Sequence, residues 1–373
     1  MGLIPVLEMT VAELAGALGP LGAPPYRAKQ IAEWVYRKGV VDPAKMTNLP
    51  PALRVEIEVL TSRLARRSDS RDGTIKLLLE MADGQHIETV LIPTERFATA
   101  CLSTQAGCAM GCVFCASGMG GLGGNLNASG MIQQWLHLWQ ASGRRPTHVV
   151  FMGMGEPLAN YDATLAALRA IVDPERIGIS ARRVTVSTVG LPAAIRRLAG
   201  EGLPITLAIS LHAPTDALRR QLIPAARKTT IEEVLRAAEE FQQSRNREVT
   251  LEYVLLAGVN DSGVCADGLA RLAMRLRCSV NVIRYNPVEG LPYRSPAEAA
   301  AGAFVQRLRK QGVNAMLRAS RGQDASAACG QLRRMRKEEK ATTDYTDSRI
   351  TQIQEEGRRR QVKKPGEETS GRS

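Results

Sequence analysis

The chain has 373 residues, of which 44% are hydrophobic and 23% charged, so it can bury a sizeable core and is not a disordered or fibrous protein. Its formal net charge of +12 favours a polyanionic partner, although a merely basic soluble protein would show the same excess. No basic segment followed by a long apolar run opens the sequence, and no window has the roughly 18 consecutive apolar residues of a membrane span, so we expect a cytoplasmic protein without a membrane partner.

The first part of the chain is predicted to be helical. Apolar residues recur at helical spacing in residues 11–18 and 26–38, and the breaker Gly-Ala-Pro-Pro separates the two segments. We therefore expect a small helical N-terminal accessory domain over residues 1–70. If the polyanionic partner is RNA, we expect this domain to contribute to binding it.

A β-hairpin is predicted next, over residues 71–94. Residues 74–81 alternate apolar and polar side chains, Ala82-Asp83-Gly84 provides a turn, and residues 86–92 return in an extended pattern.

The longest part, residues 95–332, alternates short β-rich segments with helical ones. This alternation predicts right-handed βαβ crossovers and a mainly parallel sheet or barrel. Six such units are too few for a closed eight-stranded barrel, so we expect an α/β fold with a partial (β/α)6 barrel, to which residues 313–317 could add a strand. The predicted strands are residues 98–103, 148–152, 183–187, 205–210, 249–255 and 280–284.

The end of the chain differs in composition. Residues 333–373 hold 12 basic and 8 acidic residues together with several glycines, and so predict a disordered basic C-terminal tail. The tail could touch RNA, or be a solvated extension without a role in activity.

Three of the seven cysteines form the motif Cys108-x-x-x-Cys112-x-x-Cys115, directly after a predicted strand. Three thiolates on a glycine-rich loop can each bind one iron of a 4Fe-4S cluster and leave the fourth iron open. A structural zinc site usually has four protein ligands, which makes zinc the weaker alternative. The spacing is typical of radical S-adenosylmethionine (SAM) enzymes, in which SAM binds the open iron and its reductive cleavage gives an adenosyl radical.

Polar residues and glycines stand where several predicted strands end. Gly155 and Glu156 belong to Gly-Met-Gly-Glu-Pro; the glycine lets a ligand approach the backbone, and the carboxylate can accept hydrogen bonds from the SAM ammonium group. A lone Ser or Asn at a strand end is ordinarily a turn residue, and a lone His is more often structural. Because the strand ends meet at one barrel mouth, we expect cofactor binding there. The further candidates are Ser187, Ser210, Leu211, His212 and Asn286.

Two isolated cysteines lead to a more specific resemblance. Cys101 stands seven residues before the first cluster ligand, and Cys329 lies far downstream in Ala-Ala-Cys-Gly-Gln-Leu. Together with the segments Gly-Met-Gly-Glu-Pro-Leu and Ser-Leu-His-Ala-Pro, they make the chain similar to the bacterial dual-specificity ribosomal and transfer RNA adenine-C2 methyltransferases. The resemblance covers about residues 10–332.

The resemblance implies a mechanism with two SAM molecules per turnover. The first methylates Cys329, and the second supplies the radical that removes a hydrogen atom from this S-methyl group. The resulting carbon radical adds to the adenine, and Cys101 then resolves the adduct by forming a disulfide with Cys329. Glu88 matches the proposed base for the departing adenine proton, although a solvent-facing hairpin glutamate would show the same local pattern.

The chain departs from the family pattern just after the cysteine motif. Gly124, Asn127 and Gly130 stand where the family has Arg, Thr and Glu. The cluster ligands are unaffected, but the change leaves open which RNA class is modified.

The implied partners are ribosomal RNA, transfer RNA and an external electron donor such as flavodoxin, with the protein itself a monomer. Other readings stay open at this point. They are methylation of adenine carbon 8, as in antibiotic resistance, a radical SAM activase acting on a protein, and an RNA-binding protein with a structural metal. The last two leave Cys101 and Cys329 without a role.

Overall fold

The structure is a computed structural model in which residues 2–333 are described. Apart from Arg333, the predicted tail over residues 333–373 therefore lies outside the described residues. In the described part, no helix combines the length and the apolar character that a membrane crossing requires.

A sheet of 10 strands, in the order β14-β13-β12-β11-β10-β9-β6-β5-β4-β3, is the centre of the fold. The parallel part runs from β6 to β14, which confirms the predicted partial α/β barrel and includes the additional strand near residue 315. Its strands are β6 (Ala98–Cys101), β9 (His148–Phe151), β10 (Val184–Thr188), β11 (Thr206–Ser210), β12 (Val249–Leu255), β13 (Cys278–Arg284) and β14 (Ala315–Arg318).

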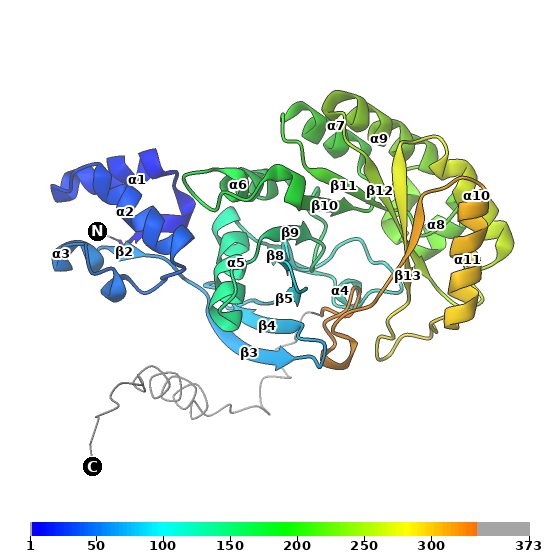
Figure 1. Ribbon diagram of the computed structural model, residues 1–373, viewed down its shortest axis with the longest axis horizontal. Helices are drawn as coiled ribbons and strands as arrows, with labels where there is room; N and C mark the ends of the chain where they lie inside the picture. Colours follow the sequence, from blue (N-terminus) through cyan, green and yellow to red (C-terminus); the bar gives the residue numbers. More distant parts are fainter. Residues whose placement is uncertain (1, 334–373) are drawn as a thin grey trace, which may run out of the picture. The chain divides into compact units, whose positions relative to one another are not determined.

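Helices follow the parallel strands and lie along the outer side of the curved sheet (Figure 1). Buried apolar residues recur along these strands, in several of them at every second position, and this pattern allowed the sequence to locate them. The helices are α5 (Ala128–Ser142), α6 (Tyr161–Val172), α7 (Pro192–Gly200), α8 (Asp216–Leu222), α9 (Ile231–Arg245), α10 (Gly263–Ala273) and α11 (Glu298–Lys310).

The other side of the sheet is antiparallel. The predicted hairpin is confirmed as β4 (Ile75–Glu80) and β5 (His86–Pro93), and β5 pairs with β6. A further strand, β3 (Arg63–Asp69), pairs with β4 at the edge of the sheet, so the helical prediction for residues up to 70 is wrong for this segment. Because most of β3 is exposed, its sequence shows no alternation of apolar and polar residues.

The N-terminal residues before β3 form small helices as predicted, namely α1 (Val11–Leu18), α2 (Tyr26–Ala32) and α3 (Pro51–Arg54). Helix α1 begins at a capping box in which Thr10 and Glu13 bond each other's backbone. A short parallel pair, β1 (Ile4–Pro5) with β2 (Ile57–Glu58), closes this region. The buried residues here belong to the same hydrophobic core as the sheet, and the predicted domain boundaries stay predictions.

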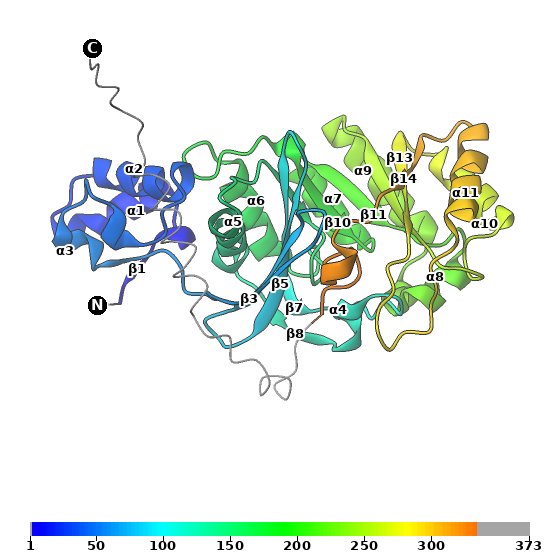
Figure 2. The ribbon, with the colours of Figure 1, turned by 60° about the horizontal axis from the view of Figure 1, so that its bottom comes forward.

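A small separate sheet supports the cysteine motif. Strand β7 (Gln105–Gly107) pairs antiparallel with β8 (Leu122–Asn125), and the short helix α4 (Ala116–Met119) lies between them in the chain. Figure 2 shows this unit beside β5 and close to the last described segment of the chain. The loop that carries the three cysteines is thus closed at its base by a hairpin.

Candidate active site

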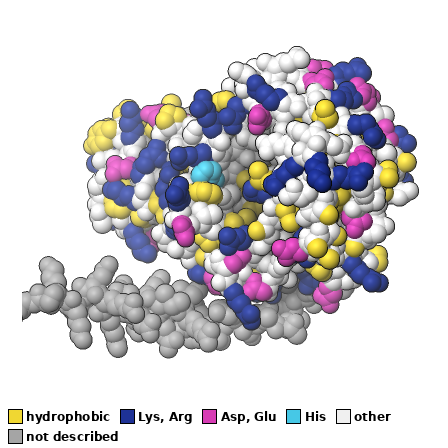
Figure 3. Space-filling view, turned by 45° about the vertical axis from the view of Figure 1, so that its right-hand side comes forward, with side chains coloured by type: hydrophobic (Ala, Val, Ile, Leu, Met, Phe, Trp, Pro, Cys, Tyr) yellow, Lys and Arg dark blue, Asp and Glu magenta, His cyan; other side chains and the backbone are white. Residues whose placement is uncertain are grey.

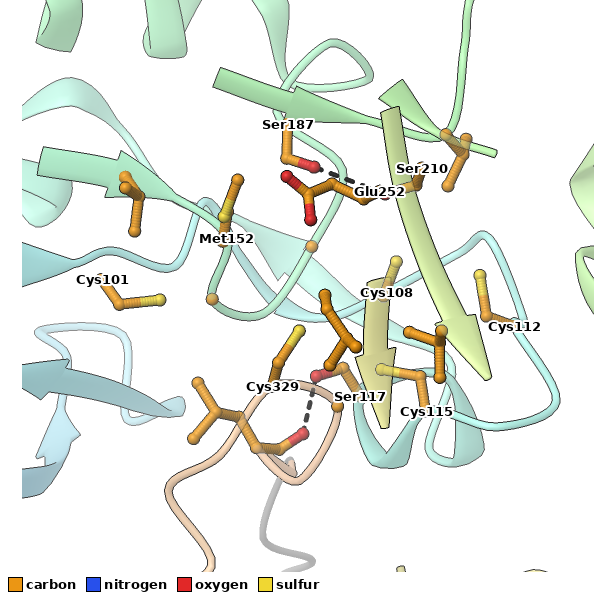
Figure 4. A pocket seen from close by; sticks show the side chains of 18 of the residues that line it. Cys101, Cys108, Cys112, Cys115, Ser117, Met152, Ser187, Ser210, Glu252 and Cys329 are labelled. Atoms are coloured by element: carbon orange, nitrogen blue, oxygen red, sulfur yellow. Dashed lines mark hydrogen bonds between the residues drawn. The ribbon is translucent and has the colours of Figure 1, made fainter. Parts of the chain in front are cut away.

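A cavity of about 240 Å³ lies at the C-terminal ends of the parallel strands. It brings together most of the residues singled out in the sequence, as Figure 4 shows for the labelled ones. Those lining it are Cys101, Cys108, Cys112, Cys115, Gly155, Glu156, Ser187, Ser210, His212, Asn286 and Cys329. Two predicted residues, Glu88 and Leu211, do not line it.

The three motif cysteines surround one end of the cavity (Figure 4). The Cys108 N–H donates to the Gly121 carbonyl across the β7–β8 hairpin at 3.1 Å, and the Cys115 N–H donates to the Cys112 carbonyl at 3.1 Å. Burial raises the pKa of all three thiols, so without iron they stay protonated. Binding of iron would therefore release protons from this loop.

This set of thiols fits a 4Fe-4S cluster better than a single ion. Within residues 2–333, no three His, Cys, Asp or Glu side chains gather closely enough to share one metal ion. In a cubane cluster each cysteine binds a different iron, so three separated thiolates around one space are what the group requires. Three cysteines bind three irons and leave one for SAM, whereas a structural zinc ion would need a fourth protein ligand.

Glycines bring the loop after β9 against residues 102–105, the segment that precedes the cysteine motif. A side chain at Gly155, where φ is +102°, would meet Gln105 Cβ at 2.7 Å, and one at Gly153 would meet the Leu102 backbone at 2.8 Å. No larger residue fits at either position. The tight loop places Glu156 at the cavity wall, where Leu158 N–H donates to Oε1 at 3.0 Å and Val189 N–H to Oε2 at 2.8 Å.

The Glu156 carboxyl group is almost completely buried, with 2% of the residue exposed. Burial raises its pKa to about 7, although the two backbone N–H groups stabilise the charged form. A buried carboxylate of this kind gains a matching partner when an ammonium group enters. The SAM amino group stays the predicted partner of this carboxylate.

Three polar side chains from neighbouring strands line the wall opposite the cysteines. Ser187 Oγ and Ser210 Oγ lie 3.4 Å apart, and the carboxylate of Glu252 is next to them (Figure 4). Burial raises the pKa of Glu252 to about 7, and Asn281 Nδ2 donates to its Oε1 at 2.8 Å. Glu252 is not among the residues predicted from the sequence; the available signal was an acidic residue inside the otherwise largely apolar strand β12.

His212 lines the cavity but is fixed by its surroundings. Val254 N–H donates to its Nδ1 at 3.1 Å, and its ring packs edge-on against Phe114 with centroids 5.0 Å apart. Burial lowers its pKa to about 3, so the ring is neutral at physiological pH. Leu211 is fully buried in the core, and its N–H donates to the Glu252 carbonyl at 3.1 Å.

The segment that carries Cys329 lies against the loop of residues 108–115, called the cluster loop below because it carries the three motif cysteines. The Ala116 N–H donates to the Gly330 carbonyl at 2.8 Å, and Ser117 Oγ donates to the Leu332 carbonyl at 2.6 Å. From the β13 side, Asn286 Nδ2 donates to the Cys329 carbonyl at 3.0 Å. These bonds bring a residue more than 200 positions downstream to the cluster cysteines.

Cys101 and Cys329 face the same space from opposite sides (Figure 4). Both are free thiols, so the predicted disulfide between them is not present in the structure. Cys329 is exposed and lines the cavity, whereas Cys101 lines it as a buried residue. Burial raises the pKa of each thiol, and the nearby Cys115 contributes for Cys329.

Glu88 lies on β5 beside this cavity and is 2% exposed, so the alternative of a solvent-facing glutamate is wrong. Its Oε1 is 2.9 Å from Lys76 Nζ, and its Oε2 accepts the Arg333 N–H at 2.9 Å. Val90 and Ile92, on the same face of the strand, do line the cavity. Glu88 therefore lies at the edge of the cavity, and both of its carboxylate oxygens already have partners.

The altered segment after the cysteine motif has a compact local structure. Asn127 caps helix α5, since its Oδ1 accepts the Gly130 N–H at 2.7 Å. A Cβ at Gly124 would meet Gln85 Nε2 at 2.5 Å. In this chain, Gln85 of the β4–β5 turn thus occupies the space that a side chain at position 124 would need.

Comparisons with known proteins agree with this geometry. The model of the radical SAM superfamily matches residues 102–266, and that of the ribosomal RNA large subunit methyltransferase N-terminal domain matches residues 4–61. The chain is 45% identical over 343 residues to a probable dual-specificity RNA methyltransferase RlmN of Rhodopirellula baltica, covering 90% of this chain and 92% of the relative. A similarly named protein of Gloeobacter violaceus is 45% identical, with 88% and 95% covered.

Among solved structures, a radical SAM methyltransferase from Sphaerobacter thermophilus has the same fold. It superposes with a TM-score of 0.85 at 45% identity, over 88% of this chain and 99% of that one.

Proposed function

The chain belongs to the dual-specificity RNA methyltransferase family of radical SAM enzymes, and from that premise we propose that it methylates carbon 2 of an adenine in ribosomal RNA, transfer RNA or both. The observation that carries the proposal is the position of Cys329. Its free thiol opens into the same cavity as the three cluster cysteines and the Glu156 carboxylate. A radical SAM activase would not need an acceptor thiol there.

The bound 4Fe-4S cluster and SAM supply an adenosyl radical in this family. The chain's own part begins with Cys329, whose sulfur takes a methyl group from one SAM molecule by displacement. Removal of a hydrogen atom from that S-methyl group then gives a carbon radical, which adds to the adenine. This route answers a chemical difficulty, because an adenine C–H carbon is too weak a nucleophile to attack SAM directly.

Two residues at the cavity complete the proposed cycle. Glu88 would accept the proton that leaves the adenine, for which its carboxylate must exchange the contacts with Lys76 and the Arg333 N–H. The radical adduct also has to lose one electron, for which the 4Fe-4S cluster would be the acceptor. Cys101, as the thiolate, would then attack the Cys329 sulfur: an S–S bond forms, the bond from sulfur to the CH2 group breaks, and this carbon takes up a proton to become the methyl group of the released base, which leaves a transient disulfide. An external reductant has to return both residues to the free thiols of the structure.

RNA binding is proposed to depend on phosphate contacts and shape. Lys and Arg side chains gather on both sides of a hollow on the face shown in Figure 3, and the chain carries a net charge of +12. A base inside a folded RNA cannot reach a buried cavity, so the target adenine must be flipped out of its stack. We further propose a monomer that receives electrons from an external donor such as flavodoxin, and a cytoplasmic location.

The direct test is mass spectrometry of nucleosides from ribosomal and transfer RNA, purified from cells that lack the protein and from cells in which it is restored. We expect 2-methyladenosine to appear on restoration, and a Cys329→Ala variant to give none. An 8-methyladenosine product would assign the enzyme to the other reaction class. No change in either RNA would contradict the proposal.

A further inference from the structure

A buried ion pair joins two neighbouring strands beside the cavity. Lys76 on β4 and Glu88 on β5 are 6% and 2% exposed, and Lys76 Nζ lies 2.9 Å from Glu88 Oε1. Neither side chain lines the cavity. Because apolar side chains of similar size are often at least as stabilising as a buried ion pair, stability alone does not account for this one.

Both members of the pair also bind the segment that carries Cys329. Lys76 Nζ donates to the Ser326 carbonyl at 3.0 Å, and the Arg333 N–H donates to Glu88 Oε2 at 2.9 Å. The first contact is on the N-terminal side of Cys329 and the second on its C-terminal side. The ion pair therefore bridges the two ends of residues 326–333, most of which line the cavity.

Residues 326–333 contain no helix or strand, so individual hydrogen bonds determine where their backbone lies. Ser326 has a φ of +49°, a region that residues with a side chain seldom adopt. The bonds from the cluster loop and from Asn286 reach residues 329, 330 and 332, in the middle of the segment. The ion pair holds the residues outside these, on both sides.

We propose that Lys76 and Glu88 are positioning residues for the Cys329 thiol, and that Glu88 has this role in addition to accepting the adenine proton. The inference rests on the proposed function, in which Cys329 accepts a methyl group. In that step the Cys329 sulfur bonds to the methyl carbon of SAM, the bond from this carbon to the SAM sulfur breaks, S-adenosylhomocysteine leaves, and the thiol proton passes to solvent.

This first methylation separates the two roles of Glu88. It requires the Cys329 sulfur to be in line with the methyl group, and a shift of about 1 Å at a reacting atom can slow a reaction by roughly 100-fold. No RNA takes part, so a residue that acts only as the base for the adenine proton has no effect on its rate.

The test uses the cluster-loaded full-length protein, without RNA and without reductant. Hydrogen–deuterium exchange read by mass spectrometry measures the mobility of residues 326–333. Labelled SAM and peptide mass spectrometry measure methylation of Cys329, starting from a thiol shown to be unmethylated.

The variants remove the charges singly and together. Lys76→Met and Glu88→Gln each leave one buried charge unpaired, so the double variant is included to remove both charges and preserve the fold. Lys76→Arg retains the positive charge. The matched control is Arg63→Met, which removes an ion pair of 2.9 Å between β3 and β4 at an exposed side chain.

In the double variant, we expect exchange in residues 326–333 to become faster by roughly tenfold or more, with exchange in β4 and β5 unchanged. Methylation of Cys329 should slow by roughly 10- to 100-fold in this variant and in each folded neutral variant. Lys76→Arg should be closer to the wild type than Lys76→Met, and Arg63→Met should equal the wild type.

Three results would overturn the proposal. They are wild-type methylation of Cys329 in the folded double variant, wild-type exchange in its residues 326–333, and equally faster exchange throughout the sheet, as for a pair needed only for packing. If the wild type itself does not methylate Cys329, the proposed function is wrong, and the exchange of residues 326–333 then decides by itself whether the ion pair holds the segment.

Discussion

Glu156 shows how one buried carboxyl group can control cofactor binding. Its pKa is raised to about 7, so at pH 6 roughly a tenth of the groups are ionised and at pH 8 roughly nine tenths. The charged form is the one that pairs with an ammonium group. Binding of SAM should therefore weaken as the pH falls below 7, because the bound proton has to be displaced first.

We predict that the SAM dissociation constant of the cluster-loaded protein rises several-fold between pH 8 and pH 6. Glu156→Gln should remove this dependence and weaken binding at pH 8 by roughly 10- to 100-fold, the loss of one charged hydrogen bond. Anaerobic equilibrium dialysis at several pH values measures both effects. Equal pH slopes in the variant and the wild type would show that another group titrates.

The two cysteines outside the cluster motif lead to a second prediction at the residue scale. Cys329→Ser should abolish methyl transfer to RNA and leave the iron content unchanged, because serine keeps the size of the side chain but not the nucleophilic sulfur. Cys265→Ser is the control, since Cys265 lies on α10 and does not line the cavity. The readout is labelled methyl groups on protein and on RNA; incorporation into RNA by Cys329→Ser would argue against the acceptor role.

The segment that carries Cys329 contains little regular structure, but hydrogen bonds fix its position. Asp324 accepts hydrogen bonds from Ser70 Oγ and from the Arg71 N–H, the latter at 3.1 Å. Asp72 accepts the Gly322 N–H at 3.0 Å, and Lys76 donates to the Ser326 carbonyl at 3.0 Å. The turn between β3 and β4 therefore holds one end of the segment, while the cluster loop holds the other.

We predict that Asp324→Ala lowers the rate of RNA methylation by roughly 10- to 100-fold without changing the iron content or the affinity for SAM. The reason is positional, since a shift of about 1 Å at a reacting atom can cost this much. Asp173→Ala is the matched control, because Asp173 also accepts a backbone N–H in a turn, from Glu175. A change in SAM affinity equal to the change in rate would indicate general disruption of the cavity.

What the sequence could predict at this scale follows from burial and from distance along the chain. The parallel strands and the β4–β5 hairpin have clear apolar patterns and were located to within a few residues. Strand β3 was missed because it is an exposed edge strand whose sequence shows no alternation of apolar and polar residues. The anchoring of Asp324 depends on residues about 250 positions away, and such pairings have no local signal.

At the scale of the whole molecule, the strand ends, the cluster loop and the Cys329 segment meet at one cavity, while charge is distributed over the surface. RNA binding at the charged surface and SAM binding in the cavity should therefore respond differently to salt. Contacts between Lys or Arg and phosphate release counterions, so RNA affinity depends steeply on ionic strength. SAM is held by a few buried groups, which salt screens much less.

We predict that the dissociation constant for transfer RNA rises by at least 10³-fold between 50 and 200 mM salt, as expected for about six or more phosphate contacts. Over the same range, the dissociation constant for SAM should change by less than about threefold. Filter binding measures the first and equilibrium dialysis the second, with the same cluster-loaded preparation. A shallow salt dependence for RNA would mean that the net charge of +12 is not used in binding, and that shape and base contacts dominate.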